Sequence, residues 1–234
     1  VLFTLQPRKA VVNDLNRELI NLYQIIKDSV EDLIQDLQQH KNEEDYFYRI
    51  RELDRKPNDY NKLTPVQRAS RIIYLNKTCY NGLFRVNKAG EFNAPFGNYK
   101  NPNIVNEITL RAVSTYFNQA QITFTCKDFA EVLIDVRKGA FVYLDPPYYP
   151  VSNTASFTGY DKGGFDNNEQ VRLKKTCDKL NRKGIKFLLS NSATDFIMDL
   201  YKDYRIEVIK AKRAINSKAD KRGEIDEVLV MNFE

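Results

Sequence analysis

The feature that most constrains the fold of this 234-residue chain is a series of short apolar runs separated by helical patterns. The runs, rich in Val, Ile, Leu and Phe, cover residues 10–12, 122–125, 140–144, 185–189, 206–209 and 228–231. Such runs are typical of buried strands in a largely parallel sheet flanked by helices. Helical patterns cover residues 15–27, 106–117, 168–182 and 194–201. The polar stretch 217–224 is too short for a crossover helix, so the last two strands are predicted to form an antiparallel hairpin.

One segment interrupts this alternation. From about residue 31 to residue 102 no buried strand is visible, only polar helical patterns and a Gly/Asn/Pro-rich stretch. We predict that residues 31–102 form an inserted, mostly helical domain, while residues 1–30 and 103–234 form the main domain. The alternative is an all-helical lid without a binding role.

Charge points to a polyanionic partner for the inserted segment. The whole chain carries a net charge of only +5, but one stretch concentrates cations with Glu91 as its only acid. A local basic segment is a better footprint for phosphate than a small global surplus. The cations are Lys62, Arg68, Arg71, Lys77, Arg85, Lys88 and Lys100.

Composition excludes several classes of protein. With His40 as the only histidine and no Cys-x-x-Cys pair, neither a zinc cage nor a Ser-His-Asp triad can be assembled. The three cysteines stand far apart, which suits a reducing, cytoplasmic setting. No apolar run of about 18 residues and no secretion signal is visible, so no membrane partner is expected.

Asp145-Pro146-Pro147-Tyr148 directly follows the apolar run 141–144. In open α/β sheets, ligands bind at the carboxyl ends of strands. Two prolines have no N–H group, so this loop offers acceptors: the Asp145 carboxylate and the Asp145 and Pro146 carbonyls. Acceptors placed on both hydrogens of an amino group on a planar base would localise the nitrogen lone pair, while Tyr148 stacks on the base. The alternative is a surface turn that ends a strand.

The string Val-Tyr-Leu-Asp-Pro-Pro-Tyr at residues 142–148 resembles the catalytic motif of amino-group DNA methyltransferases. The Asp form is typical of enzymes that methylate adenine N6. The resemblance implies S-adenosylmethionine as cofactor and catalytic roles for Asp145, Pro146 and Tyr148. No metal is expected, because this methyl donor is already activated. Methylation at a cytosine ring carbon needs a Pro-Cys nucleophile, and all three cysteines here follow threonine.

Residues 74–85 and 90–102 resemble the DNA-recognition region of Dam-like N6-adenine DNA methyltransferases, the GATC methylases. The resemblance implies double-stranded DNA as partner and GATC as target. Tyr80 would fill the gap left by an extruded adenine, and Asn81 would bond the orphaned thymine. Arg85 would bind guanine in the major groove. The other predicted DNA contacts are Lys77, Leu83 and Pro95. Asn98 departs from the family, in which an arginine suited to a backbone contact stands there. The alternative is a hairpin with an incidental arginine.

Two acids suit the cofactor. Asp14 closes the first predicted strand, where an acid suits ribose hydroxyls. The family resemblance implies this role for Asp14, and places Asp128 on the adenine amino group with Phe129 beside the ring. Asp145 would also border the cofactor, and Phe165 would line its pocket. Either Asp14 or Asp128 could instead be a helix N-cap.

The fold that the resemblance implies is a Rossmann-like, S-adenosylmethionine-dependent methyltransferase with a mixed sheet of seven strands. Its first strand and the glycine loop after it would precede Val1, so we expect the main domain to be incomplete at its N-terminus and to bind cofactor poorly. One rival is a relative that binds DNA without methylating it. Another is an RNA adenine methyltransferase, which a major-groove arginine disfavours. A cognate restriction nuclease as partner is left open.

Overall fold

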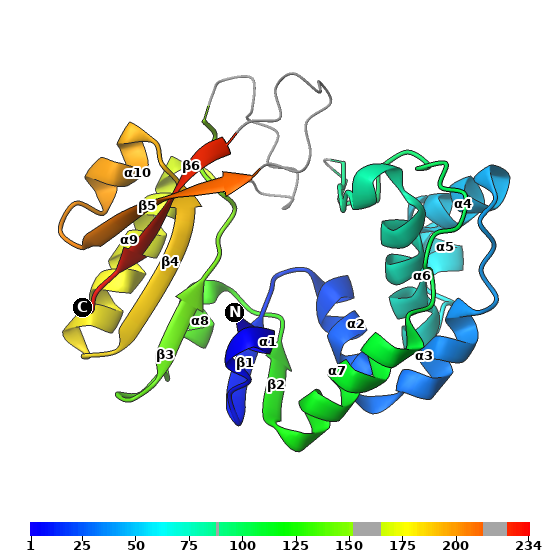
Figure 1. The fold of residues 1–234 in the computed structure, drawn as a ribbon, viewed down its shortest axis with the longest axis horizontal. Coiled ribbons are helices and arrows are strands. Elements are labelled where there is room, and N and C mark those ends of the chain that lie inside the picture. Colours follow the sequence, from blue (N-terminus) through cyan, green and yellow to red (C-terminus); the bar gives the residue numbers. More distant parts are fainter. Residues whose placement is uncertain (88, 152–164, 213–223) are drawn as a thin grey trace. The chain divides into compact units, whose positions relative to one another are not determined.

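The computed structural model describes residues 1–87, 89–151, 165–212 and 224–234. These residues form two compact units, Val1–Phe129 and Ala130–Glu234, which are described separately (Figure 1). None of the helices in the described ranges is both long and apolar enough to cross a membrane.

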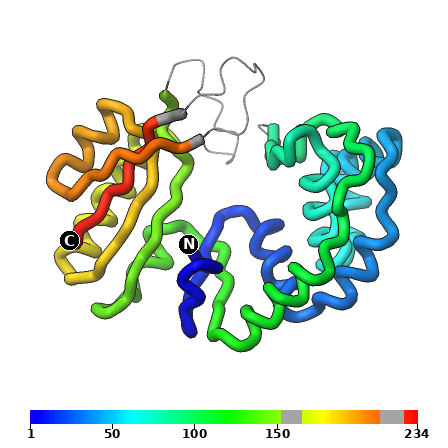
Figure 2. The backbone as a smooth tube through the Cα atoms, viewed as in Figure 1, coloured from blue at the N-terminus to red at the C-terminus, as the bar shows by residue number. Residues whose placement is uncertain are grey.

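In the first unit, two strands that are far apart in the sequence lie side by side (Figures 1 and 2). Strand β1 (Lys9–Asn13) pairs in parallel with β2 (Gln121–Thr125). A short helix α1 (Leu2–Leu5) precedes them, and α2 (Arg17–Asp28) and α7 (Glu107–Gln119) connect them to the rest of the unit. The Asn16 side chain caps α2 by accepting from the amides of Glu18 and Leu19.

Helices fill the sequence between β1 and β2. These are α3 (Val30–Leu37), α4 (Glu44–Arg51), the 3₁₀ turn η1 (Glu52–Arg55), α5 (Pro57–Tyr60), α6 (Pro65–Thr78) and the 3₁₀ turn η2 (Tyr80–Gly82). Helix α6 begins with a capping box between Thr64 and Gln67 and is buried along much of its length. It contributes to two apolar clusters, one with α2, α3 and α7 and one around Phe47 and Phe92.

In the second unit, four strands form one mixed sheet in the order β3-β4-β6-β5. Strand β3 (Phe141–Leu144) is parallel to β4 (Lys186–Ser192). Strands β5 (Arg205–Lys212) and β6 (Glu224–Met231) are antiparallel to each other, and β6 is antiparallel to β4. The unit also contains α9 (Asn167–Arg182), α10 (Asp195–Leu200) and all of α8 (Phe129–Val132) except its first residue.

The α/β class, the six strands and the four connecting helices are confirmed to within a few residues. The antiparallel final pair is also confirmed, although most of its predicted connection, residues 217–223, lies outside the described residues. The strands form two sheets, one in each unit, with two parallel and two antiparallel pairings. The predicted division at residues 30 and 102 remains a prediction.

Candidate functional site

The Asp-Pro-Pro-Tyr loop, residues 145–149, leaves the carboxyl end of β3 beside the parallel strand β4. Asp145 is exposed, and its Oδ1 accepts a hydrogen bond of 2.8 Å from the Ser190 hydroxyl. The same hydroxyl lies 3.2 Å from the Tyr143 hydroxyl. One carboxylate oxygen is therefore held by the protein, and no residue of the described ranges donates a hydrogen bond to the other.

Two backbone carbonyls of this loop accept hydrogen bonds from protein side chains. Pro147 O accepts from Gln170 Nε2 at 3.1 Å, and Tyr149 O accepts from the Ser192 hydroxyl at 2.6 Å. Within the described part of the chain, no group donates to Pro146 O. Among the described residues, the Asp145 carboxylate and the Pro146 carbonyl thus keep acceptor capacity, and their predicted catalytic roles remain predictions.

Tyr148 is half-buried, with its hydroxyl 3.4 Å from Glu227 Oε2. The pKa of this phenol is raised to about 12, chiefly by burial; a hydrogen bond with Ser190 lowers it, and the nearby carboxylates of Asp145 and Glu227 add to the increase. The hydroxyl is therefore neutral at physiological pH. The next ring, Tyr149, packs on Phe196 with 4.7 Å between centroids.

In the first unit, Asp14 and Asp128 follow the two parallel strands β1 and β2. Asn13 ties the strand ends together, because its side chain donates to Lys127 O at 2.8 Å and accepts from Lys127 N at 3.0 Å. Parallel strands end at the same edge, so both acids lie at one edge of this sheet. Asp14 Oδ1 accepts from Asn16 N at 2.7 Å, whereas Asn16 caps α2; the N-cap alternative for Asp14 is therefore wrong.

The two predicted aromatic neighbours of the cofactor are both half-buried. Phe129 directly follows Asp128 in the first unit, and Phe165 belongs to the second. The glycines before Phe165, at positions 163 and 164, lie outside the described residues.

The 79–97 loop begins where α6 ends and returns to the same place. Tyr80 N donates to Pro95 O and Gly97 N to Thr78 O, both at 2.8 Å. A Cβ added at Gly97 would lie 2.7 Å from Cys79 O, so only glycine allows this approach. Asn81 has a φ of +54°, a left-handed conformation in which asparagine is among the tolerated residues. The loop therefore has a defined backbone at the predicted DNA contacts.

The predicted DNA-contacting side chains of this region are mostly accessible. Lys77, Tyr80, Arg85 and Pro95 are exposed, while Asn81 and Leu83 are half-buried. The structure brings Tyr80 next to Pro95 through their backbone bond. Arg85 Nη2 donates to the backbone and side-chain oxygens of Asn93 at 2.7 and 3.3 Å, which holds the guanidinium in place.

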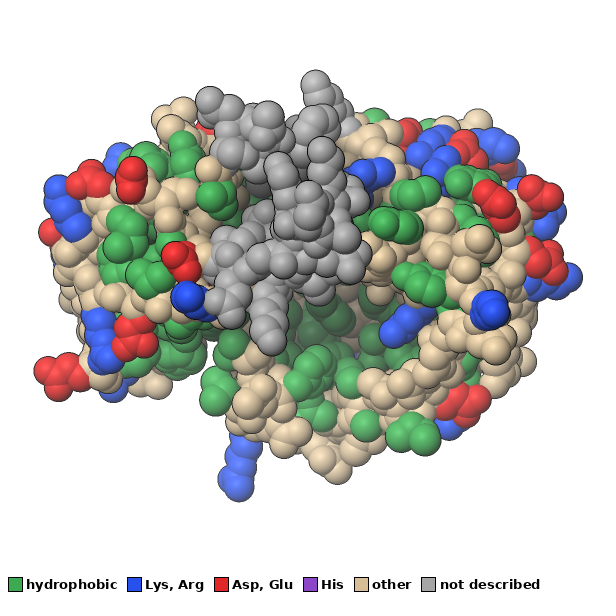
Figure 3. All heavy atoms as spheres, turned by 45° about the horizontal axis from the view of Figure 1, so that its top comes forward, with side chains coloured by type: hydrophobic (Ala, Val, Ile, Leu, Met, Phe, Trp, Pro, Cys, Tyr) green, Lys and Arg blue, Asp and Glu red, His purple; other side chains and the backbone are tan. Residues whose placement is uncertain are grey.

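Two cations of the basic segment hold the protein together, so the phosphate-footprint prediction is wrong for them. Arg71 is only 3% exposed, and its Nη2 lies 2.8 Å from Asp54 Oδ2. Arg68 donates to Tyr60 O and pairs with Glu18. Both belong to α6, which packs on several neighbours. In Figure 3, Lys and Arg side chains are intermixed with acids on the visible surface of this unit.

Comparison with known proteins identifies the family. The family model for D12 class N6 adenine-specific DNA methyltransferases matches residues 1–215. The chain belongs to this family. It is 42% identical over 233 residues to the Type II methyltransferase M1.LlaDCHI of Lactococcus lactis subsp. cremoris, covering 99% of this chain and 82% of the relative. It is 32% identical over 235 residues to the DNA adenine methylase of Escherichia coli K12, covering 94% and 78%.

A further relative is the Type II methyltransferase M.MjaIII of Methanocaldococcus jannaschii, 41% identical over 238 residues, with 97% of this chain and 81% of the relative covered. The predicted family is thus confirmed, and the protein is an adenine-specific DNA methyltransferase. DNA as substrate is confirmed with it, against the RNA alternative.

Sequence reasoning missed the residues that support the motif of this methyltransferase. These are Gln170 on α9, Glu227 on β6, and Ser190, Asn191 and Ser192 on β4. A signal was present: three polar residues follow the apolar run 185–189, at the strand end where ligands bind.

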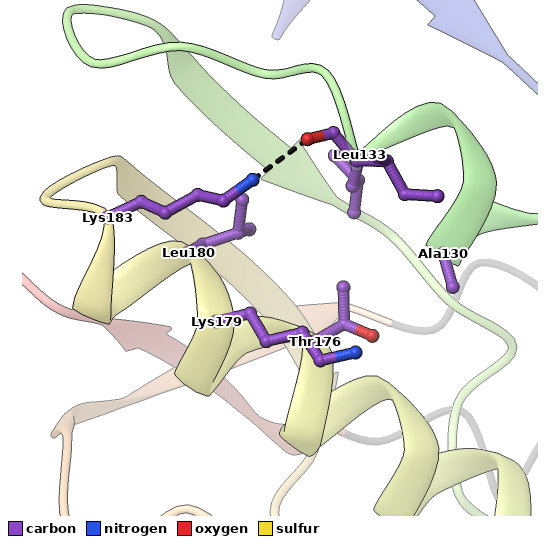
Figure 4. A pocket seen from close by; sticks show the side chains of 7 residues that line it. Ala130, Leu133, Thr176, Lys179, Leu180 and Lys183 are labelled. Carbon is purple, nitrogen blue, oxygen red and sulfur yellow. Dashed lines mark hydrogen bonds between the residues drawn. The ribbon is translucent and has the colours of Figure 1, made fainter.

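The methyltransferase has a groove of about 250 Å³ between α8 and α9, apart from the predicted site residues (Figure 4). Lys183 donates to a backbone oxygen of Ile134 across it at 2.8 Å. The described ranges contain no group of three or more His, Cys, Asp or Glu side chains suited to a metal ion.

Proposed function

We propose that this DNA methyltransferase transfers a methyl group from S-adenosylmethionine to N6 of an adenine extruded from a GATC site in duplex DNA. The observation that carries the proposal is the division of acceptors in the Asp-Pro-Pro-Tyr loop. Ser190 and Gln170 engage Asp145 Oδ1 and Pro147 O, which leaves one Asp145 oxygen and Pro146 O for the two N–H groups of an adenine N6 amine.

Each residue of the loop has a distinct task in this proposal. Asp145 and Pro146 O accept the two amino hydrogens and so localise the nitrogen lone pair for attack. Tyr148 supplies a ring that stacks on the base, and its neutral hydroxyl is steered by Glu227. The acceptors act by position and charge, without a covalent enzyme intermediate. Asp145 is also a suitable acceptor for the proton that the methylated nitrogen releases.

The hydrogen-bond acceptors that follow β1 and β2 fit S-adenosylmethionine. The half-buried carboxylates of Asp14 and Asp128 are acceptor-only groups, which match ribose hydroxyls and an adenine amino group. We assign Phe129 to the face of the cofactor's adenine ring, with Phe165 and Asp145 as further lining residues. The bound cofactor would supply a sulfonium-activated methyl group.

For DNA, we assign Arg85 to guanine and Leu83 and Pro95 to base edges or a thymine methyl group. Tyr80 and Asn81 would replace the extruded adenine. Lys77, which is exposed, would contact phosphate. The exposed side chains and the ordered loop backbone support these roles, and the GATC target follows from the family resemblance of residues 74–85 and 90–102.

The proposed layout is a Rossmann-like main domain of residues 1–30 and 103–234, with residues 31–102 inserted for target recognition. Its support is the order β3-β4-β6-β5, in which the last strand pair is antiparallel, and the helical content of residues 31–78. We place the enzyme in the cytoplasm with its DNA. Some relatives are named Type II methyltransferases and others DNA adenine methylases, so no nuclease partner is proposed.

The test is transfer of labelled methyl from S-adenosylmethionine to two duplexes that differ only in a GATC or a GTAC site, using the full-length protein. Label in N6-methyladenine on the GATC duplex alone is the expected result. Equal label on both duplexes would retain the chemistry and reject the GATC assignment. Specific binding without label on either would favour a relative that binds DNA without methylating it.

A further inference from the structure

We infer that Gln170 and Asn191 are a positioning pair, which sets the Asp-Pro-Pro-Tyr loop by a one-way relay of hydrogen bonds. This inference rests on the proposed function, because it concerns the same loop. Both side chains are completely buried, at 0% exposure, although each is a polar amide. A buried amide is costly unless its hydrogen-bonding groups are satisfied, so the partners of this pair show what it is for.

The direction of the relay is fixed at its first member. Asn191 Oδ1 accepts from two backbone amides, Tyr149 N at 2.8 Å and Ser192 N at 2.9 Å. The opposite atom, Nδ2, must therefore be the donor, and it donates to Gln170 Oε1 at 3.2 Å. Gln170 in turn has only its amide nitrogen left, and Nε2 donates to Pro147 O at 3.1 Å.

The relay compensates for what the prolines remove. Pro146 and Pro147 lack N–H groups, so the loop cannot be held there by donors of its own. The relay instead grips Tyr149 N after the prolines and Pro147 O within them. Ser192 adds a bond to Tyr149 O at 2.6 Å. The residues that come directly after Pro146 in the chain are thereby fixed. The Pro146 carbonyl, which would accept from the adenine amine, is held in position through them.

Position is the property that such a loop needs. A displacement of about 1 Å at reacting groups can lower a rate by about 100-fold. Gln170 and Asn191 bond the loop rather than substrate, so they are positioning residues, and their loss should lower the rate of chemistry more than the affinity for DNA.

The sharpest variant is Asn191→Asp, which keeps the size of the side chain. At high pH the new carboxylate presents an oxygen, in place of Nδ2, to Gln170 Oε1; Gln170 then turns and its donor leaves Pro147 O. When protonated, the acid can again donate to Gln170. Complete burial raises the pKa of a carboxyl group here, whereas the backbone amides of Tyr149 and Ser192, which donate to this side chain, lower it. We expect burial to dominate and to bring protonation toward the assay range. The defect should therefore shrink as pH falls.

The experiment measures single-turnover methylation of a GATC duplex by the full-length wild-type protein, Asn191→Asp and Gln170→Met, at about pH 8.5 and about pH 6. We expect both variants to lose roughly 10- to 100-fold in rate at the higher pH, with DNA affinity within about threefold. The Asn191→Asp deficit relative to wild type should shrink at least roughly fivefold at the lower pH, while that of Gln170→Met should not. Comparison with wild type at each pH cancels titrations common to both proteins.

Thr176→Val is the matched control on the same helix, since Thr176 is buried and its hydroxyl bonds only a backbone oxygen of α9. It should keep the wild-type rate. A wild-type rate in Asn191→Asp or in Gln170→Met at the higher pH would overturn the relay.

Hydrogen exchange on the wild-type protein covers the case in which the variants do not fold. The Tyr149 amide should be protected to the same degree as amides within β4, and exchange at the rate of an exposed loop would overturn the inference. If wild-type protein fails to methylate DNA, the proposed function fails, and the exchange result still decides whether the loop is held.

Discussion

The two loops to which we assign function are held in opposite ways. The Asp-Pro-Pro-Tyr loop is held by hydrogen bonds to buried polar side chains of β4 and α9. The 79–97 loop is closed by its own backbone hydrogen bonds and by hydrogen bonds between the Phe92 backbone and the charged side chains of Asp54 and Arg55. Asp54 Oδ2 accepts from Phe92 N at 2.7 Å and pairs with Arg71, while Arg55 donates to Phe92 O at 2.9 Å.

The difference matches the tasks of the loops. Acceptors that bind a single amine must be fixed in position. The uncharged amides of Gln170 and Asn191 can fix them without adding a charge near the reacting nitrogen. A loop that reads DNA must keep its side chains exposed, so its support comes from the backbone and from an ion pair on its inner side. The supports of the two loops share no residue, so substitutions can disrupt each of them separately.

Asp145→Ala should abolish nearly all methylation, by at least about a thousandfold in single-turnover rate, because it removes a charged acceptor at the reacting nitrogen. GATC binding should persist, since the 79–97 loop is untouched. Rates and DNA dissociation constants measured on one preparation would check this. Substantial methylation by the variant would remove Asp145 from the chemistry.

Arg71→Met should destabilise the first unit by about 3 kcal/mol, the low end for breaking a buried pair, because Asp54 is 13% exposed and can regain water. The measurement is urea unfolding. Lys62→Met is the control, since Lys62 is 76% exposed beside Asp59 and should change stability little. Equal stability of the two variants would show that Asp54 and Arg71 do not support the loop.

Arg85→Ala should reduce discrimination between GATC and a site with its guanine replaced by about 2 kcal/mol, because the bidentate contact is lost. Lys77→Ala is the contrast: it should weaken both sites alike and lower the salt dependence by about one phosphate contact. Competition binding at several salt concentrations separates the two. Unchanged discrimination in Arg85→Ala would move guanine recognition to another residue.

Tyr148→Phe should have the smallest effect, within about fivefold in rate, because the ring remains and the variant loses a long bond to Glu227 and an interaction with Ser190. The pKa of Tyr148 is raised to about 12, so the phenol stays protonated in the folded protein at pH values up to about 10. Wild type and variant should therefore have pH–rate profiles of the same shape up to about pH 10. A wild-type decline there that is absent from the variant would contradict this assignment.

Much of the secondary structure could be predicted from the sequence, because the apolar runs and helical periods are local signals. The limits of β4 show where such signals end. The apolar run stops at Leu189, but the strand continues through Ser192 by pairing with β6. The helices α3 to α6 are predicted from the sequence only as a region, since their individual bounds depend on packing around α6.

The charges show a second limit. A count of cations along residues 62–100 cannot separate Arg71, which is buried against Asp54, from Arg85, which is exposed. Asp54 and Arg71 lie on different helical segments, and only folding brings their side chains together.

The sequence by itself determined the chemical groups of this methyltransferase: the Asp-Pro-Pro-Tyr motif, the acids that follow β1 and β2, and the strings that mark its family. These are properties of adjacent residues, and a chain without its fold still displays them. Only the tertiary structure decided which acceptors of the motif are occupied, which cations are buried and which amides hold the loop. Such properties depend on contacts between residues distant in sequence and on the exclusion of water, which arise only when the chain packs.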